Sequence, residues 1–111
     1  MNAPAPGFKA SALLAYLSAH IGRDKGVSAR DVARWINWSE REVRKYVSEL
    51  REHGHPVCGT PRSGYYLAAT EEEWQETDAF LYARAMHTLR RLAQVRKISL
   101  PDLLGQLRLK T

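Results

Sequence analysis

Two helix starts that lie close together in the chain constrain its fold most. Ser28 is followed three residues later by Asp31, and Ser39 is followed three residues later by Glu42. A serine oxygen in this position accepts a hydrogen bond from a free backbone N–H, and the acid three residues on can bond back to the start of the helix. The first helix must end before Ser39. The sequence therefore predicts a short helix, a tight turn at Asn37, which tolerates a left-handed backbone, and a second helix.

Both helices are expected to bury one face. In the first, Val32, Ala33 and Ile36 recur at helical spacing, and in the second, over residues 39–51, apolar residues recur every three or four positions. Gly54 is typical of a residue that closes a helix. The buried positions predicted for the second helix are Val43, Tyr46 or Val47, and Leu50. The opposite face carries Glu40, Arg41, Arg44, Lys45, Ser48 and Arg51.

The chain before these helices is interpreted as a leader followed by another helix. Residues 1–7 are small, uncharged and Pro-rich, which is typical of a flexible leader. A helix is predicted over residues 9–21, and the polar residues 22–26 form the turn that follows it. The stripe that this helix should bury is Leu13, Leu14, Leu17 and Ile21.

The periodicity changes after Gly54. Residues 56–59 and 65–68 each have the length and composition of a short strand, and the Pro- and Gly-containing residues 60–64 lie between them. This pattern predicts a β-hairpin. Packing in the core, rather than stacking on a base, is the role expected for both Tyr65 and Tyr66.

The C-terminal part of the chain predicts two further helices. No helix breaker occurs over residues 71–97, and Thr70 with Glu73 can cap the start of this long helix. A short amphipathic helix should begin after Ser99. The long helix carries a broad apolar stripe made of Trp74, Leu81, Tyr82, Ala85, Met86, Leu89, Leu92 and Ala93.

Together these elements predict an α+β fold class that is mainly α with a small β-hairpin. The expected organisation is the leader of residues 1–7, a compact domain over residues 8–69, and a helical extension over residues 70–111. The extension can either pack back on its own domain or meet its copy in a homodimer, and we expect a homodimer through residues 71–109.

Charge is distributed unevenly along the chain. The formal net charge is +5. Residues 1–19 contribute +1, residues 20–70 contribute +3, residues 71–79 contribute −5, and residues 80–111 contribute +6. A basic balance favours a polyanionic partner, with nucleic acid first and an acidic membrane surface second. Because the longest apolar run is far too short to span a bilayer, no membrane partner is expected.

The residues that could carry chemistry form no catalytic or metal-binding set. His53, His55 and Cys58 have HxHxxC spacing, but a structural zinc site needs a fourth ligand that the sequence does not place nearby. We therefore expect no enzyme activity, no cofactor and no small-molecule effector. A single cysteine cannot form an internal disulfide, and with no secretory signal it indicates a cytoplasmic protein.

Residues 27–68 resemble the N-terminal winged-helix domain of bifunctional biotin ligase/repressor proteins and related bacterial or phage regulators. The matching features are the helix after Ser28, the turn ending at Ser39, the Val43, Val47 and Leu50 spacing, the LREHG helix end and the PRSGYYL hairpin. Asn37 stands where that family usually has glycine, and no ligase domain follows. The resemblance implies a winged helix-turn-helix and DNA binding without ligase activity.

The resemblance also implies that the helix over residues 39–51 lies in the major groove. We expect DNA contacts from Ser39, Arg41, Arg44, Lys45 and Ser48 on that helix, and from Arg62 and Ser63 at the hairpin tip. A solvated helix face whose arginines pair with neighbouring glutamates is the alternative for the helix, and a plain exposed turn is the alternative for the tip.

The function expected is that of a small transcriptional regulator that binds double-stranded DNA. A protein-interaction adaptor built on the same scaffold is an alternative from a different class. A phage or plasmid replication accessory protein is a third possibility, which shares the DNA contact but not the regulatory outcome.

Overall fold

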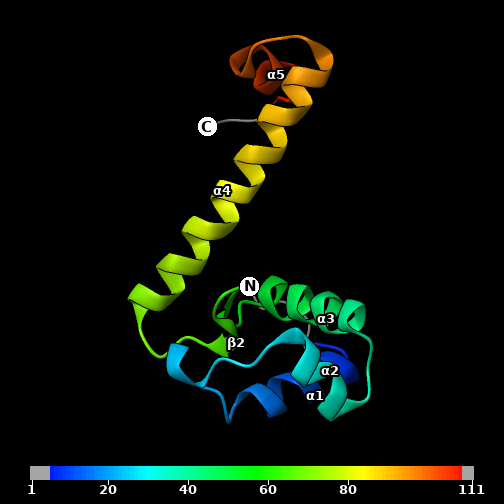
Figure 1. Ribbon diagram of the computed structural model, residues 1–111, viewed down its shortest axis with the longest axis vertical. Helices are drawn as coiled ribbons and strands as arrows, with labels where there is room; N and C mark the ends of the chain where they lie inside the picture. The colour runs from blue at the N-terminus through cyan, green and yellow to red at the C-terminus, as the bar shows by residue number, and fades with distance from the viewer. Residues whose placement is uncertain (1–5, 109–111) are drawn as a thin grey trace. The chain divides into compact units, whose positions relative to one another are not determined.

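The computed structural model describes residues 6–108 (Figure 1). The chain forms two compact units, one ending at Thr77 and the other beginning at Asp78, which we call the N-terminal unit and the C-terminal unit. The elements in chain order are α1 (Phe8–Leu17), the 3-10 turn η1 (Arg23–Lys25), α2 (Ala29–Ile36), α3 (Glu40–Glu52), β1 (Val57–Thr60), β2 (Gly64–Leu67), α4 (Glu71–Arg96) and α5 (Leu100–Leu107).

The predicted fold class is confirmed, because the described residues are mainly helical and hold one antiparallel two-stranded hairpin. Of the expected leader, residues 1–5 lie outside the described residues. Gly7, its last residue, donates its N–H to Glu49 Oε2 at 2.8 Å, and α1 begins at the next residue.

The capping residues place α2 and α3 where the sequence predicts them. Ser28 Oγ accepts a hydrogen bond from Asp31 N at 3.1 Å. Ser39 and Glu42 form a reciprocal capping box, with distances of 3.1 Å from Glu42 N to Ser39 Oγ and 3.2 Å from Ser39 N to Glu42 Oε1. Asn37 adopts the left-handed backbone, with φ of 68°. The tight turn between the two helices is thus set by local chemistry.

The core of the N-terminal unit lies where α3 packs against α1, α2 and β1. Of the two positions left open in α3, Val47 is buried and Tyr46 is half-buried against the core. Removing these apolar side chains from water is the main source of stability for the unit. The buried residues of this core are Ala10, Leu13, Leu17, Val32, Ala33, Val43, Val47, Leu50 and Val57.

Helix α1 is shorter than the sequence predicts. It ends at Leu17, and the chain then pairs with β2: Leu67 N donates to His20 O at 2.8 Å, and Gly22 N donates to Leu67 O at 2.8 Å. The helical stripe therefore stops before Ile21, whose side chain is 50% exposed. Backbone pairing with a strand distant in sequence ends the helix, and local periodicity does not report such pairing.

Strand β2 is hydrogen-bonded along both edges. On one side it pairs antiparallel with β1, in the register Cys58 with Tyr66. On the other side Val27 and Tyr65 exchange two backbone hydrogen bonds of 2.9 and 2.7 Å. The approach is close enough that a Cβ on Gly26 would meet Ser63 O at 2.0 Å, so only glycine fits there.

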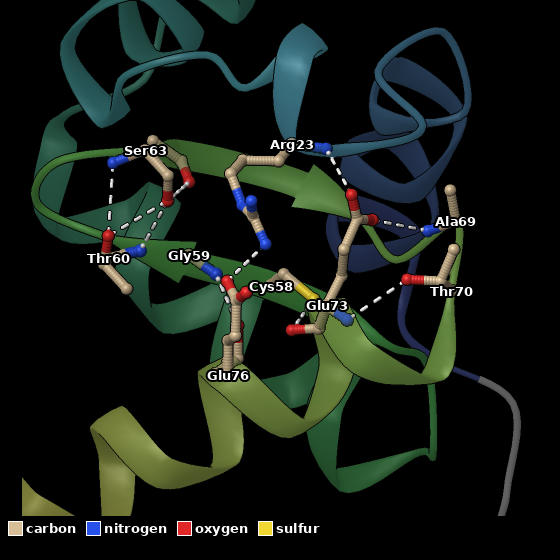
Figure 2. A network of polar contacts seen from close by, with 11 residues as sticks. Arg23, Cys58, Gly59, Thr60, Ser63, Ala69, Thr70, Glu73 and Glu76 are labelled. Carbon is tan, nitrogen blue, oxygen red and sulfur yellow. Dashed lines mark hydrogen bonds and ion pairs between the residues drawn. The ribbon is translucent and has the colours of Figure 1, made fainter.

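The start of α4 belongs to the N-terminal unit. Thr70 Oγ1 caps the helix by accepting from Glu73 N at 3.2 Å, and the Glu73 carboxylate accepts from Arg23 N at 3.0 Å and from Ala69 N at 2.8 Å (Figure 2). The buried Thr77 hydroxyl accepts from Gly59 N at 3.3 Å. These bonds explain why the two units divide after Thr77 rather than at the expected boundary of residues 69 and 70.

The C-terminal unit holds the rest of α4 and all of α5. The long helix ends at Arg96, one residue before the predicted end, and Lys97 follows in the left-handed conformation. Ser99 Oγ then caps α5 by accepting from Asp102 N at 3.2 Å. Both predicted C-terminal helices are present, and the same kind of cap starts α5 as starts α2 and α3.

The contacts of Glu73 predict a pH-dependent stability. The N–H groups of Arg23 and then Ala69 hold the pKa of the Glu73 carboxyl below its ordinary value of 4.5. A carboxyl whose pKa is lowered on folding stabilises the fold above its unfolded pKa, and this contribution is lost as the pH falls through the folded value. We expect the free energy of unfolding to fall below about pH 4.5.

The decrease in the free energy of unfolding at low pH, which we call the acid limb, should be shallower when Glu73 is replaced with Gln. Urea titrations repeated at several pH values measure it. Glu72→Gln, on the exposed side of the same turn, is the matched control and should leave the limb unchanged. The pKa of the Glu42 carboxyl is also lowered, by the Ser39 backbone and then by Lys9, so its protonation contributes to the slope that remains. An identical acid limb in Glu73→Gln and the parent would contradict the assignment.

Candidate nucleic-acid interface

One face of α3 is exposed and basic. Arg41, Arg44, Lys45 and Ser48 follow one another at intervals of three, one and three residues, which places them on a single helical stripe. All four are exposed, whereas Val43, Val47 and Leu50 on the other side of the helix are buried. The packing of α3 therefore fixes which face it presents to solvent.

The cationic groups on this stripe are held loosely. Arg44 Nη1 lies 4.0 Å from Glu40 Oε1, and more than half of each side chain is exposed. Lys45 Nζ lies 5.4 Å from the centre of the Tyr46 ring. Exposed ion pairs of this kind contribute little and exchange readily, so both cations remain available to an anionic partner.

Two of the four α3 glutamates that could neutralise the stripe are engaged with α1 or its N-cap instead; the four are Glu40, Glu42, Glu49 and Glu52. Glu42 closes the capping box and lies 3.3 Å from Lys9 Nζ. Glu49 accepts the N–H of Gly7. Charge-assisted hydrogen bonding from the Ser39 backbone, and then from Lys9, lowers the pKa of Glu42. The alternative in which all the acids pair with the stripe arginines is therefore weakened.

The two serines of the expected site have structural partners. The Ser39 hydroxyl caps α3. At the hairpin tip the Ser63 hydroxyl accepts from Thr60 N at 3.1 Å and lies 3.0 Å from Thr60 Oγ1 (Figure 2). Each serine hydroxyl therefore has a role within the fold, Ser39 at the start of α3 and Ser63 at the hairpin tip. Their direct contact with DNA stays a prediction.

Arg62 is the exposed cation of the hairpin tip, which comprises Pro61 to Ser63. It also lines a cleft of about 560 Å³ between the hairpin, η1 and the first turns of α4. Arg23 crosses this cleft to form an ion pair with Glu76 (Figure 2). The lining residues are Arg23, Asp24, Gly26, Thr60, Arg62, Ser63, Tyr66, Glu76 and Thr77.

The residues that line the cleft include two cations and two acids, so their formal charges cancel. A hydrogen bond with Tyr66 and then the charge of Glu76 raise the pKa of Arg23 above its ordinary value, so this exposed cation already has partners in the protein. Asp24 is a second acid on the lining. The cleft therefore offers Arg62, at its edge, as the cation with the freest approach to a polyanion.

Arg51 does not belong to the basic stripe, although the sequence places it on the polar face. Its Nε donates to Val57 O at 2.9 Å, which ties the end of α3 to β1, and burial lowers its pKa.

The prediction that Tyr65 and Tyr66 pack in the core is confirmed, with Tyr66 2% exposed and Tyr65 packed against the core cluster.

Sequence reasoning missed Arg23, whose partners Glu73 and Glu76 lie some fifty residues later in the chain. No local pattern signals such a contact.

The HxHxxC residues serve other purposes. His53 Nδ1 lies 2.9 Å from Glu49 O at the end of α3, and Cys58 is buried with its Sγ 3.6 Å from Glu73 O. Burial raises the pKa of the Cys58 thiol. Within residues 6–108, no three His, Cys, Asp or Glu residues gather where they could hold a metal ion.

In the same part of the chain, no helix has the length and apolar character needed to cross a membrane.

Comparison with known proteins gives no relative for the chain: no family model, no curated protein and no solved structure matches it.

Proposed function

We propose that the N-terminal unit is a winged helix-turn-helix that binds double-stranded DNA through α3. The observation that carries the proposal is the exposed basic stripe of Arg41, Arg44, Lys45 and Ser48 on a helix whose opposite face is buried. The major groove of B-DNA, about 12 Å wide, admits one α-helix. A helix anchored along one side and basic along the other meets that requirement.

The arrangement around α3 supports the same proposal. Helices α2 and α3 are joined by a tight turn, and a hairpin follows them directly. This order is that of the N-terminal domain in biotin ligase/repressor proteins, which residues 27–68 resemble. Asn37 takes the left-handed conformation that the usual glycine of that turn would take.

The side chains suggest a division of roles. Arg41 and Arg44 can each donate two hydrogen bonds to the paired acceptors of guanine, while Lys45 acts as a point charge near phosphate. Ser48 can bond either base type. Arg62 at the hairpin tip is placed to bind a phosphate or to enter the minor groove. Phosphate contacts would supply affinity, and the two α3 arginines would supply sequence preference.

The C-terminal unit supports self-association. Among the described residues of this unit, only Ala93 and Leu103 are buried. We therefore propose a homodimer through residues 71–109, of which residue 109 lies outside the described part. Two copies would present two α3 helices to half-sites roughly 34 Å apart, as in dimeric regulators. The function that follows is that of a non-enzymatic transcriptional regulator in the cytoplasm.

Binding to duplex DNA should depend steeply on salt. If the interface neutralises about five phosphates, the logarithm of the association constant should fall with the logarithm of salt concentration at a slope of about −4 to −5. Fluorescence anisotropy with a labelled duplex at several salt concentrations measures this slope. The proposal fails if no binding occurs at low salt, or if binding occurs without salt dependence.

Replacing Arg44 with Ala should relax the sequence preference. Selection of bound sites from random duplex DNA would first give the preferred sequence of the parent protein, with two-fold symmetry if the dimer binds. The variant should bind this site more weakly by about 1 to 3 kcal/mol and accept other bases at one position of each half-site.

Arg84→Ala is the matched control for Arg44→Ala, because it removes the same charge from α4 in the C-terminal unit. It should leave the selected sequence unchanged, whatever its effect on affinity. If Arg44→Ala keeps both the affinity and the sequence preference of the parent, a helix other than α3 reads the DNA.

A further inference from the structure

The C-terminal unit has too few buried side chains to be stable by itself. Only Ala93 and Leu103 are buried among its described residues, whereas Tyr82 and Val95 are 64% and 74% exposed. Units of fewer than about 40 residues usually need a disulfide, a metal or oligomerisation to fold. The described residues of this unit hold no cysteine and no cluster that could hold a metal. Two means of covering α4 remain, which are packing on its own N-terminal unit and association with a partner surface.

The apolar residues of α4 form a narrow stripe suited to another helix. Tyr82, Ala85, Leu89 and Leu92 follow at intervals of three, four and three residues, which is the spacing of a helix-pairing seam. Leu81 and Met86 flank the stripe on its two sides and are half-buried. The seam is thus apolar over the middle of the C-terminal part of α4.

The same spacing continues to a charged residue at each end of the seam. Asp78 precedes Tyr82 by four residues, and Arg96 follows Leu92 by four residues. Both are exposed, and Arg96 Nη1 donates to the neutral Gln106 of α5 at 3.3 Å. Since a guanidinium has five N–H donors, this bond leaves others free for a carboxylate. The seam therefore carries an acid at one end and a base at the other.

We infer that α4 pairs with α4 of a second copy in the antiparallel direction, with Asp78 opposite Arg96 of the partner subunit. This inference rests on the self-association proposed above and specifies its surface and direction. In this register Tyr82 lies opposite Leu92 of the partner subunit, and the small Ala85 lies opposite the large Leu89 of the partner subunit. The small Ala85 leaves room for the Leu89 side chain of the partner subunit at the centre of the seam, and Tyr82 with Leu92 of the partner subunit fills the space on either side.

The charges select this direction over the parallel one. In a parallel pair in register, Asp78 would face Asp78 of the partner subunit and Arg96 would face Arg96 of the partner subunit. Like charges on the seam oppose association, whereas the antiparallel pair contains the Asp78–Arg96 ion pair twice. Charge complementarity thus identifies a second copy of this chain, rather than an unrelated protein, as the occupant of the stripe.

The direction can be tested with Asp78→Asn in the full-length protein, by sedimentation equilibrium at low salt. The antiparallel pair loses two ion pairs, so its dissociation constant should rise roughly tenfold. A parallel pair would lose a repulsion, so its dissociation constant would fall. Because the readout is mass and needs no DNA, a failure of the proposed DNA binding would not affect it.

Two further variants complete the experiment. Asp78→Arg combined with Arg96→Asp should restore the dimer, because it rebuilds the ion pair in reverse, whereas either swap alone should weaken it. Arg84→Gln removes a charge off the seam and is the matched control, which should match the parent. A parent protein that stays monomeric at all concentrations overturns the inference, and so does a dimer that Asp78→Asn strengthens or leaves unchanged.

Discussion

The burial of one side of α3 is the constraint on which the rest of the account depends. Val43, Val47 and Leu50 are held among α1, α2 and β1, so the helix cannot rotate without exposing them to water. This burial directs Arg44 and its neighbours outward as a consequence of packing. The same contact thus supplies the stability of the N-terminal unit and the orientation of its candidate interface.

Hydrogen bonding to β2 and to Glu73 joins the remaining parts of the N-terminal unit to this core. Strand β2 has partners on both edges, which draws the segment before α2 against the hairpin. Glu73 then fixes the start of α4 to η1. The hairpin tip that carries Arg62 is therefore built on backbone pairing with several segments, and the direction in which it extends from α3 is set by the fold.

Local chemistry made much of this fold predictable. The serine caps, the left-handed Asn37 and the Pro- and Gly-containing hairpin tip each act within a few residues, so α2, α3 and the hairpin could be placed from the sequence, as could α4 and α5. The end of α1 and the contacts of Arg23 could not, because each depends on a residue far away in the chain. The role of Arg51 depends on the backbone carbonyl of Val57 in the following strand, which a helical pattern does not report. For the candidate site, the sequence indicated the exposed face of α3, but not that Ser39 and Ser63 bond within the protein.

The central claim is that α3 enters the groove of duplex DNA, and amide chemical-shift mapping tests it most directly. Titrating the ¹⁵N-labelled protein with duplex DNA at low salt should move the backbone signals of residues 41–48 most, with a second group at residues 61–63. Signals that move only in α4 and α5, with α3 unchanged at saturation, would contradict the account.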